Sequence, residues 1–254
     1  MTYPHIRLVR IVSGRIKPTQ RSTPNETKVD PYSDAKIVES WQRNAAPWTD
    51  AVRERKIESR SLVTDAAIVA AVLSRAPRTV LDIGCGEGWL ARALGQHGIR
   101  VTGVDVVPAL IDAASKAGGG DFRVASYEMI AAGRLELAPV DVVVANFSLI
   151  GRESVDNLIA AVPSMLAPSG ALVVQTLHPL VATADLPYVD GWRDGSWTGF
   201  GADFSDPAPW YFRTLETWVK LLHETGFYLA ELREPLHPTS QKAASVIFIA
   251  QVTG

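Results

Sequence analysis

Cysteine, net charge and long apolar runs are all scarce in this sequence, and each shortage excludes a class of protein. The single cysteine, Cys85, has no partner for an internal disulfide, and no Cys/His cluster has the spacing of a zinc site. We therefore expect no metal and a reducing, cytoplasmic setting. A formal net charge of −2 over 254 residues gives no long-range attraction for phosphate backbones, so we expect no nucleic-acid partner. No apolar stretch approaches the roughly twenty residues of a membrane span.

The start of the chain differs from the rest by its basic excess. We interpret residues 1–32 as a flexible basic tail, with a transit-like segment as the alternative. Because one α/β domain of 200 to 250 residues is routine, residues 33–254 are predicted to form a single domain, as a monomer or homodimer. The charged residues of the tail are Arg7, Arg10, Arg15, Lys17, Arg21 and Lys28, against Glu26 and Asp30.

Periodicity divides the domain into a helical preface and an α/β sheet. Residues 33–75 carry apolar positions at helical spacing, with Pro47 between an earlier and a later segment and Asp65 placed to cap a helix over 66–73. Downstream, apolar strands alternate with helices, which is typical of a doubly wound, mostly parallel sheet. The predicted strands are 79–83, 100–104, 122–125, 141–145, 171–176, 228–232 and 244–251.

A glycine loop follows the first predicted strand. The run from Asp82 to Gly88 reads Asp-Ile-Gly-Cys-Gly-Glu-Gly, which lets the backbone turn sharply and approach a ligand before the next helix. Asp105 ends the second strand, where its carboxylate can accept both hydroxyls of a ribose. The loop and Asp105 together predict a ligand that contains adenosine.

The spacing of the loop distinguishes two cofactors. Nicotinamide dinucleotides need a glycine or alanine one position after Gly88, beneath the pyrophosphate, but Trp89 stands there. S-adenosylmethionine has no pyrophosphate, and Asp82 can help to bind its cationic amino acid end. The spacing therefore favours S-adenosylmethionine over NAD(P).

These residues resemble the first two motifs of the class I S-adenosylmethionine-dependent methyltransferases. The likeness starts near Leu62, continues through 141–146 and the Leu-Ala-Pro-Ser-Gly turn at 166–170, and reaches the C-terminus. It resembles most the quinone and natural-product branch. The resemblance implies a Rossmann-like, seven-stranded sheet whose last strand is antiparallel and inserted beside the fifth.

Carried over to this chain, the resemblance implies a set of cofactor contacts. The glycines line the methionine moiety, Asp105 holds the ribose, Val106 packs on the adenine and Asn146 faces the amino acid portion. Arg60, in the preface, is a candidate for the cofactor's carboxylate, and a plain charged helix face is the alternative. The predicted contacts are Arg60, Asp82, Gly84, Cys85, Gly86, Gly88, Asp105, Val106, Ser126, Tyr127 and Asn146.

Two positions depart from the pattern of the family. Many relatives have an aspartate after the third strand that binds the adenine amino group. This chain has Ser126 at that position, and either the serine side chain or backbone atoms take the place of the aspartate. The Asn-Pro-Pro-aromatic motif of exocyclic amine methyltransferases is absent after the fourth strand, which has Asn146-Phe147-Ser148 instead. Methylation of a nucleobase amine is therefore disfavoured.

A long aromatic segment, 178–213, is predicted to form a substrate lid. Ligands bind outside the carboxyl ends of parallel strands, so this segment should cover the acceptor, although its rings could equally anchor a long connection to the core. His178 follows the fifth strand and is the candidate general base, with an ordinary hydrogen-bonded loop histidine as the alternative. The predicted substrate-binding residues are Trp192, Trp197, Trp210, Tyr211 and Arg213.

The predicted function is therefore transfer of a methyl group from S-adenosylmethionine to a small molecule through oxygen, nitrogen or carbon. Such an in-line displacement needs mainly alignment and exclusion of water. Two alternatives remain: an NAD(P)-dependent oxidoreductase, which Trp89 and the lack of a Tyr-x-x-x-Lys pair disfavour, and a non-catalytic protein that binds S-adenosylmethionine.

Overall fold

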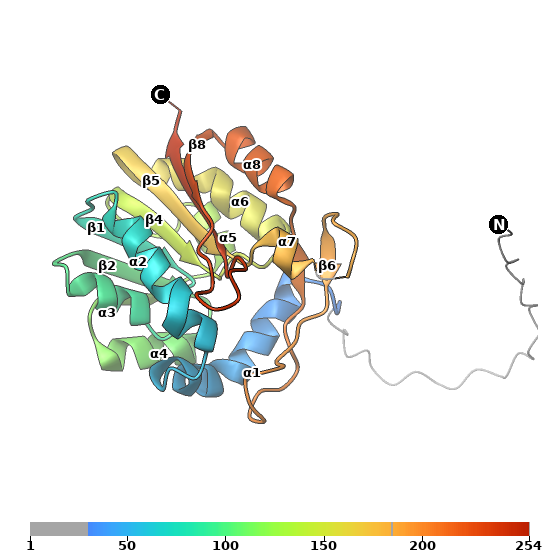
Figure 1. Cartoon of the computed structure of the whole chain (residues 1–254). Helices are drawn as coiled ribbons and strands as arrows, with labels where there is room; N and C mark the ends of the chain where they lie inside the picture. Colours follow the sequence, from blue (N-terminus) through green and yellow to red (C-terminus); the bar gives the residue numbers. More distant parts are fainter. Residues whose placement is uncertain (1–29, 184, 254) are drawn as a thin grey trace, which may run out of the picture.

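The structure, a computed structural model, describes residues 30–183 and 185–253 and is built on one seven-stranded sheet. The strand order is β3-β2-β1-β4-β5-β9-β8 (Figure 1). Most of the predicted basic tail, residues 1–29, lies outside the described residues. The strands are β1 (Thr79–Ile83), β2 (Arg100–Asp105), β3 (Asp121–Val124), β4 (Val140–Asn146), β5 (Leu166–Thr176), β8 (Phe227–Arg233) and β9 (Val246–Val252).

The directions of the strands confirm the predicted fold class. Strands β1 to β5 pair in parallel, as in Val80 opposite Val101 and Val142, while β9 lies antiparallel between β5 and β8. The central strands β1, β4, β5 and β9 are almost wholly buried, which explains their continuous apolar composition. All the parallel strands therefore end at one edge of the sheet, where the glycine loop begins.

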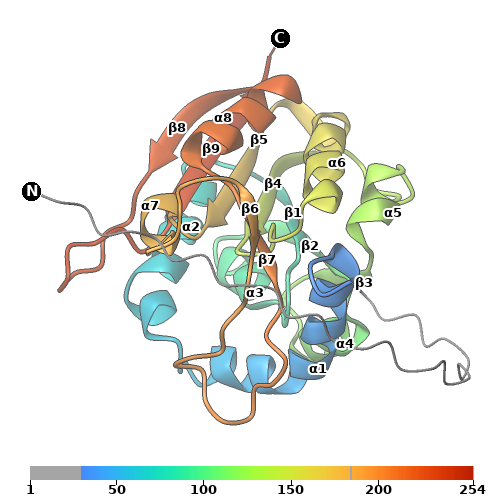
Figure 2. The same cartoon turned by 90° about the vertical axis from the view of Figure 1, so that its right-hand side faces the viewer.

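Helices cover both faces of the sheet (Figures 1 and 2). One core unites alternate residues of the strands with α5, α6 and α8, and the other unites the intervening residues with α2 and α3. Because strand side chains alternate between faces, Leu81 and Ile83 enter the first core, whereas Val80 and Asp82 point to the second. The helices are α2 (Asp65–Leu73), α3 (Trp89–Gly95), α4 (Pro108–Ala117), α5 (Tyr127–Ala131), α6 (Glu153–Ala161) and α8 (Leu215–Glu224).

The helical preface forms, but the prediction that Pro47 divides it is wrong. Helix α1 runs without a break from Asp34 to Arg53 and lies beside α4 (Figure 1). Proline removes one backbone donor from the helix. Buried residues on both sides of it, Ala45 and Thr49, pack the two halves against the rest of the molecule, and this packing overrides the local preference.

The prediction that Asp65 caps a helix is also wrong. A short π-helical turn, η1 (Arg60–Thr64), leads directly into α2, so Asp65 is already inside a helical stretch. Its carboxylate instead accepts a hydrogen bond from Arg60 Nε at 2.9 Å. Single π turns inside helices are frequent at functional sites, and this one carries Arg60.

The predicted lid, 178–213, has some regular structure that periodicity did not reveal. It contains the short helix α7 (Pro179–Ala182) and a hairpin of β6 (Gly191–Arg193) and β7 (Trp210–Phe212). Between the hairpin strands, the connection descends to α1 (Figure 2), where Asn44 exchanges two hydrogen bonds with the backbone of Ser205. The lid and the preface are therefore joined to each other.

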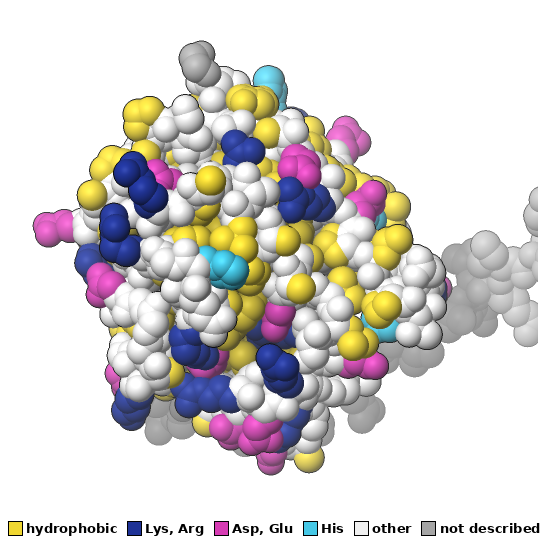
Figure 3. All heavy atoms as spheres, turned by 60° about the vertical axis from the view of Figure 1, so that its left-hand side comes forward, with side chains coloured by type: hydrophobic (Ala, Val, Ile, Leu, Met, Phe, Trp, Pro, Cys, Tyr) yellow, Lys and Arg dark blue, Asp and Glu magenta, His cyan; other side chains and the backbone are white. Residues whose placement is uncertain are grey.

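Charged side chains and helices of the described part can be compared with the near-neutral composition of the sequence. Basic and acidic side chains are interspersed on the face in Figure 3. No helix in residues 30–183 or 185–253 combines the length and apolar character of a membrane span. In the same residues, no three His, Cys, Asp or Glu side chains gather as a metal site would require.

Candidate functional site

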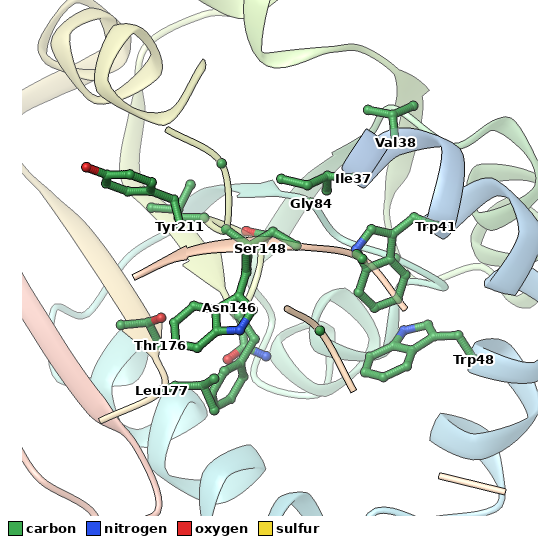
Figure 4. Close-up of a pocket in the computed structure, with 18 of the residues that line it drawn as sticks. Ile37, Val38, Trp41, Trp48, Gly84, Asn146, Ser148, Thr176, Leu177 and Tyr211 are labelled. Atoms are coloured by element: carbon green, nitrogen blue, oxygen red, sulfur yellow. The ribbon is translucent and has the colours of Figure 1, made fainter. Parts of the chain in front are cut away.

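A cavity of about 600 Å³ lies at the carboxyl edge of the sheet. Its floor comes from the ends of β1, β2, β4 and β5, and its roof from α1 and the lid. In Figure 4, Trp41 and Trp48 project from α1 on one side, and Asn146, Thr176 and Leu177 lie on the other. This is the edge at which open α/β sheets bind their ligands.

The glycine loop shapes the floor beneath this cavity. Gly84, Gly86 and Gly88 all have left-handed φ angles, of 74°, 56° and 81°. A side chain at Gly84 would overlap Ser148, and one at Gly88 would lie 2.8 Å from Phe122. Gly86 faces the cavity, where an added Cβ would meet only the Trp48 indole nitrogen at 3.6 Å. The loop therefore needs glycine for packing at two positions and leaves room for a ligand at Gly86.

Asp105 holds the loop in place and also faces the cavity. Its two carboxylate oxygens accept hydrogen bonds from the backbone of Val107 at 2.9 Å and Gly86 at 3.0 Å. Burial raises the pKa of Asp105, and these backbone donors oppose the rise. Each carboxylate oxygen accepts more than one hydrogen bond, so both can still accept a ribose hydroxyl.

Near the loop, two buried groups of opposite charge each keep one polar atom that makes no hydrogen bond within the described residues. Arg60 is 9% exposed and lines the cavity, and its Nη2 has no hydrogen-bond partner. Asp82 is 2% exposed, and its Oδ2 has no partner either. Burial, with a smaller contribution from Asp105, raises the pKa of Asp82 to about 7. A buried polar atom without a hydrogen bond is costly, so both groups are candidate contacts of a ligand.

The Arg60 side chain is held in a fixed orientation. Its guanidinium lies 4.7 Å from the ring centre of Trp89 and 5.7 Å from that of Trp48, and its Nε bonds to Asp65. Two indole rings and the Asp65 carboxylate thus fix the orientation of the Arg60 guanidinium. Nη2 makes no hydrogen bond within the described residues.

The other predicted cofactor contacts divide into wall residues and supporting residues. Cys85, Val106, Ser126, Tyr127 and Asn146 line the cavity, whereas Asp82 and Gly88 lie behind the wall. The predicted contacts also bond within the protein: the Ser126 hydroxyl caps α5 by accepting from Met129, the Tyr127 hydroxyl donates to the Ser148 carbonyl, and the Asn146 amide oxygen accepts from Gln175. Burial raises the pKa of the Cys85 thiol, so it stays protonated and acts as a small apolar side chain.

Aromatic side chains from distant segments meet above the cavity. Trp197 and Phe200 from the lid contact Trp41 and Trp48 from α1, with ring centres 5.6 Å and 6.2 Å apart. Of the predicted substrate contacts, Trp197, Trp210, Tyr211 and Arg213 line the cavity. Trp192 does not and packs edge-on against Tyr211 instead. Helix α1 also supplies Ile37 and Val38, whose role local periodicity could not separate from that of core residues.

His178, the predicted base, is not among the residues that line the cavity. The side chain is 3% exposed, and its Nε2 lies 2.7 Å from Oε1 of Glu234, which follows β8. The histidine therefore joins the start of α7 to the connection between β8 and β9. A carboxylate on one ring nitrogen leaves the other able to act as a base, and Nδ1 makes no hydrogen bond within the described residues, so the role of His178 stays a prediction.

Two structural features of the site escaped the analysis of the sequence. Glu87, between two of the loop glycines, is buried and accepts from Arg53 of α1 and Arg92 of α3, so it fastens the loop to both helices. Phe147, directly after β4, has a φ of 54° and lines the cavity. An acidic residue between two glycines of the loop is a sequence signal that could have suggested the first feature. No local signal in the sequence indicates the second.

Comparison with known proteins agrees with this geometry. A profile of the family described as a methyltransferase domain matches residues 54–232. A ubiquinone biosynthesis O-methyltransferase of Xylella fastidiosa is 34% identical over 115 residues, which cover 43% of this chain and 46% of that protein. An uncharacterised methyltransferase of Schizosaccharomyces pombe is 26% identical over 63% of each chain. The chain thus spans about half to two thirds of the length of these curated relatives.

Solved structures share the fold at low sequence identity. The 1,6-didemethyltoxoflavin-N1-methyltransferase of Burkholderia thailandensis, with its substrate and S-adenosylhomocysteine bound, has a TM-score of 0.62 at 18% identity, covering 87% of this chain and 88% of that one. The magnesium protoporphyrin IX methyltransferase of Synechocystis, with S-adenosylhomocysteine bound, has a TM-score of 0.60 at 18% identity, covering 87% of this chain and all of that one. The profile match covers well over half of the chain. The chain therefore belongs to the methyltransferase-domain family.

Proposed function

We propose that this chain transfers the methyl group of S-adenosylmethionine to a small aromatic or apolar acceptor. The observation that supports the cofactor assignment is that Arg60, on the cavity wall, and Asp82, behind it, each keep a buried polar atom without a hydrogen bond in the described residues. The amino acid end of S-adenosylmethionine is a zwitterion, so its carboxylate suits Arg60 and its ammonium suits the side of Asp82. Bound there, the cofactor would supply an electrophilic methyl group.

The remaining cofactor contacts would orient the molecule along the edge of the sheet. Asp105, at the end of β2, would accept the ribose hydroxyls, and Val106 and Ser126 lie on the same wall for the adenine. Gly84 and Gly86 would allow the methionine portion to approach the backbone. The NAD(P) alternative is not favoured, because the matching family profile is that of methyltransferases.

The acceptor assignment rests on the character of the remaining wall. Residues from α1, β4, β7 and the lid supply mainly aromatic and aliphatic side chains there. Two charged residues on this wall, Asp34 and Arg213, are engaged within the protein: Asp34 accepts from the backbone of Arg152 and Ser154, and Arg213 donates to Gly151 and Asp156. Such a wall favours a planar, uncharged acceptor over a charged one.

The proposed chemistry depends on position more than on proton transfer. Methyl transfer from a sulfonium is an in-line displacement, and holding the two reacting atoms together removes much of the entropic barrier. The aromatic roof formed by Trp41, Trp48, Trp197 and Phe200 would exclude water from the reacting atoms.

Calorimetric titration tests the cofactor assignment. The wild type should bind S-adenosylmethionine and S-adenosylhomocysteine but not NADH, and Asp105→Ala should weaken binding of both sulfur ligands at least tenfold. Asp112→Ala removes the same charge from an exposed position on α4 and should bind like the wild type. Failure to bind either sulfur ligand, or preference for NADH, would contradict the proposal.

A second experiment tests the class of acceptor. The protein is incubated with S-adenosylmethionine labelled in its methyl group and with a panel of phenols, catechols and aromatic amines, beside tRNA and denatured protein. Label should pass to a small aromatic compound. Labelling of only the macromolecules would contradict the small-molecule assignment while leaving the cofactor assignment intact.

A further inference from the structure

The cavity has two ends that the strand order defines. Asp105 at the end of β2, Gly84 after β1, Asn146 at the end of β4 and Thr176 at the end of β5 all line it, and these strands are neighbours in that order. Next along the edge is β9, and Ala244, just before that strand, also lines the cavity. The end at β5 and β9 is therefore the one farthest from the proposed ribose site at Asp105.

That far end is apolar and opens to the surface. Its wall includes Leu177, Pro179, Ala182 and Ala244. Leu177 is on the cavity wall and is also 47% exposed to solvent. Leu177 therefore belongs both to the cavity wall and to the exposed side chains.

The segment that follows Leu177 carries several exposed aliphatic side chains, which with Leu177 and Leu236 we call the α7 apolar patch. Leu180 and Val181 on α7 are 61% and 49% exposed, and Leu186 and Val189, just after α7, are 54% and 60% exposed. Exposed aliphatic residues are ordinary when single, but a cluster that adjoins a pocket marks a site of interaction. The α7 apolar patch comprises Leu177, Leu180, Val181, Leu186, Val189 and Leu236.

The patch is held in place beside the cavity. The contact between His178 and Glu234 joins the start of α7 to the connection between β8 and β9. Leu236 belongs to that connection, pairs with Ala243, and so lies next to the cavity residue Ala244. Figure 1 shows α7 beside this connection, so segments far apart in the sequence form one surface.

We propose that the acceptor carries an apolar extension that leaves the cavity at Leu177 and lies on the α7 apolar patch. This inference rests on the proposed function, because it assumes that the reacting group of the acceptor lies between Asn146 and the aromatic roof. The occupant is the acceptor's own aliphatic chain, since the patch is continuous with the acceptor end of the cavity and an extended substrate covers both at once.

A series of 4-alkylphenols with S-adenosylhomocysteine present tests the proposal. Calorimetry gives the dissociation constants of 4-ethylphenol and 4-hexylphenol for the wild type, for Leu180→Asp, and for Val219→Asp. Val219 is 40% exposed on α8 and makes the latter a matched control. Each buried methylene strengthens binding by up to about fourfold. We expect at least a tenfold preference for the hexyl compound in the wild type and in Val219→Asp, and less than threefold in Leu180→Asp.

Other outcomes would overturn the inference in distinguishable ways. If the wild type binds S-adenosylhomocysteine but binds the two phenols equally, the proposed apolar extension of the acceptor is contradicted. The proposed function is then unaffected. An unchanged preference in Leu180→Asp would place the chain elsewhere. Two further outcomes would contradict the inference if the wild type shows no preference for the hexyl compound. Sedimentation of the wild type with phosphatidylcholine vesicles would assign the patch to a bilayer. A dimer that Leu180→Asp disrupts would assign the patch to a second copy of the chain. Failure to bind S-adenosylhomocysteine would contradict the proposed function itself.

Discussion

At the scale of single residues, the site combines a cationic and an anionic group that the protein leaves without full pairing. Arg60 Nη2 makes no hydrogen bond within the described residues, although Asp65 and two indole rings hold the guanidinium in place. Asp82 is more deeply buried, and its Oδ2 has no hydrogen-bond partner among the described residues. Each arrangement destabilises the free protein and favours a zwitterionic ligand. Substitution of Arg60 should therefore change ligand affinity, and substitution of Asp82 should change the stability of the free protein.

Replacing Arg60 should weaken binding of S-adenosylmethionine by one selective interaction. In Arg60→Met, loss of a charge-assisted hydrogen bond should cost about 1.5–3 kcal/mol, which is roughly ten- to a hundredfold in the dissociation constant. 5′-Methylthioadenosine has no amino acid end and should bind the variant and the wild type equally in calorimetry. An equal loss for both ligands would indicate a general disturbance of the cavity instead.

Asp82 should make the stability of the free protein depend on pH. Burial raises its pKa from 3.8 to about 7, so between those pH values the folded state holds a proton that the unfolded state has released. The free energy of unfolding contributed by this group therefore falls as the pH rises from about 4 to about 7. Asp82→Asn should stabilise the free protein more at pH 8 than at pH 5, by on the order of 2 kcal/mol. Thermal unfolding at both pH values measures the difference.

The same variant should bind S-adenosylmethionine less tightly at pH 8, because the ionised carboxylate that favours the ligand's ammonium is gone. Asp112→Asn on the surface of α4 is the control for both measurements and should show neither effect. A pH-independent difference between Asp82→Asn and the wild type would show that Asp82 does not titrate in this range.

At the scale of elements, the roof of the cavity depends on the connection between α1 and the lid. Lys36 and Arg43 of α1 pair with Asp206, and Asn44 bonds to the backbone of Ser205. The charged pairs are partly exposed, and such pairs contribute little. The buried amide of Asn44 should therefore contribute most of the connection, because its loss leaves buried polar groups unpaired.

Removing this amide should loosen the lid without disturbing the cofactor end. In Asn44→Ala, backbone amides in residues 195–209 should exchange with solvent about tenfold faster, measured by hydrogen exchange with mass spectrometry. The dissociation constant of S-adenosylhomocysteine should change less than threefold, because the predicted cofactor contacts do not include the lid. Asn157→Ala, at an exposed position of α6, should leave exchange in 195–209 unchanged.

At the scale of the whole molecule, the sequence predicts the sheet far better than the roof. Buried parallel strands are continuous apolar runs, and the Asp82–Gly88 loop is a local motif, so both can be read from neighbouring residues. The unbroken course of α1 through Pro47, the Arg60–Asp65 pair and the contact of Asn44 with Ser205 depend on segments that meet only after folding. His178 illustrates the limit, since its position after β5 predicts a base, but no local pattern predicts its contact with Glu234, 56 residues away.

Because the walls come from the preface, the sheet and the lid, a ligand in the cavity should stabilise the molecule as a unit. S-adenosylhomocysteine at a hundred times its dissociation constant should add about 2.7 kcal/mol to the free energy of unfolding, which raises the Tm by roughly 5–10 °C for a domain of this size. Differential scanning calorimetry measures the shift at several ligand concentrations. Asp105→Ala at the same concentrations should shift much less, whereas Asp112→Ala should follow the wild type; equal shifts in all three proteins would mean that the ligand binds away from the carboxyl edge of the sheet.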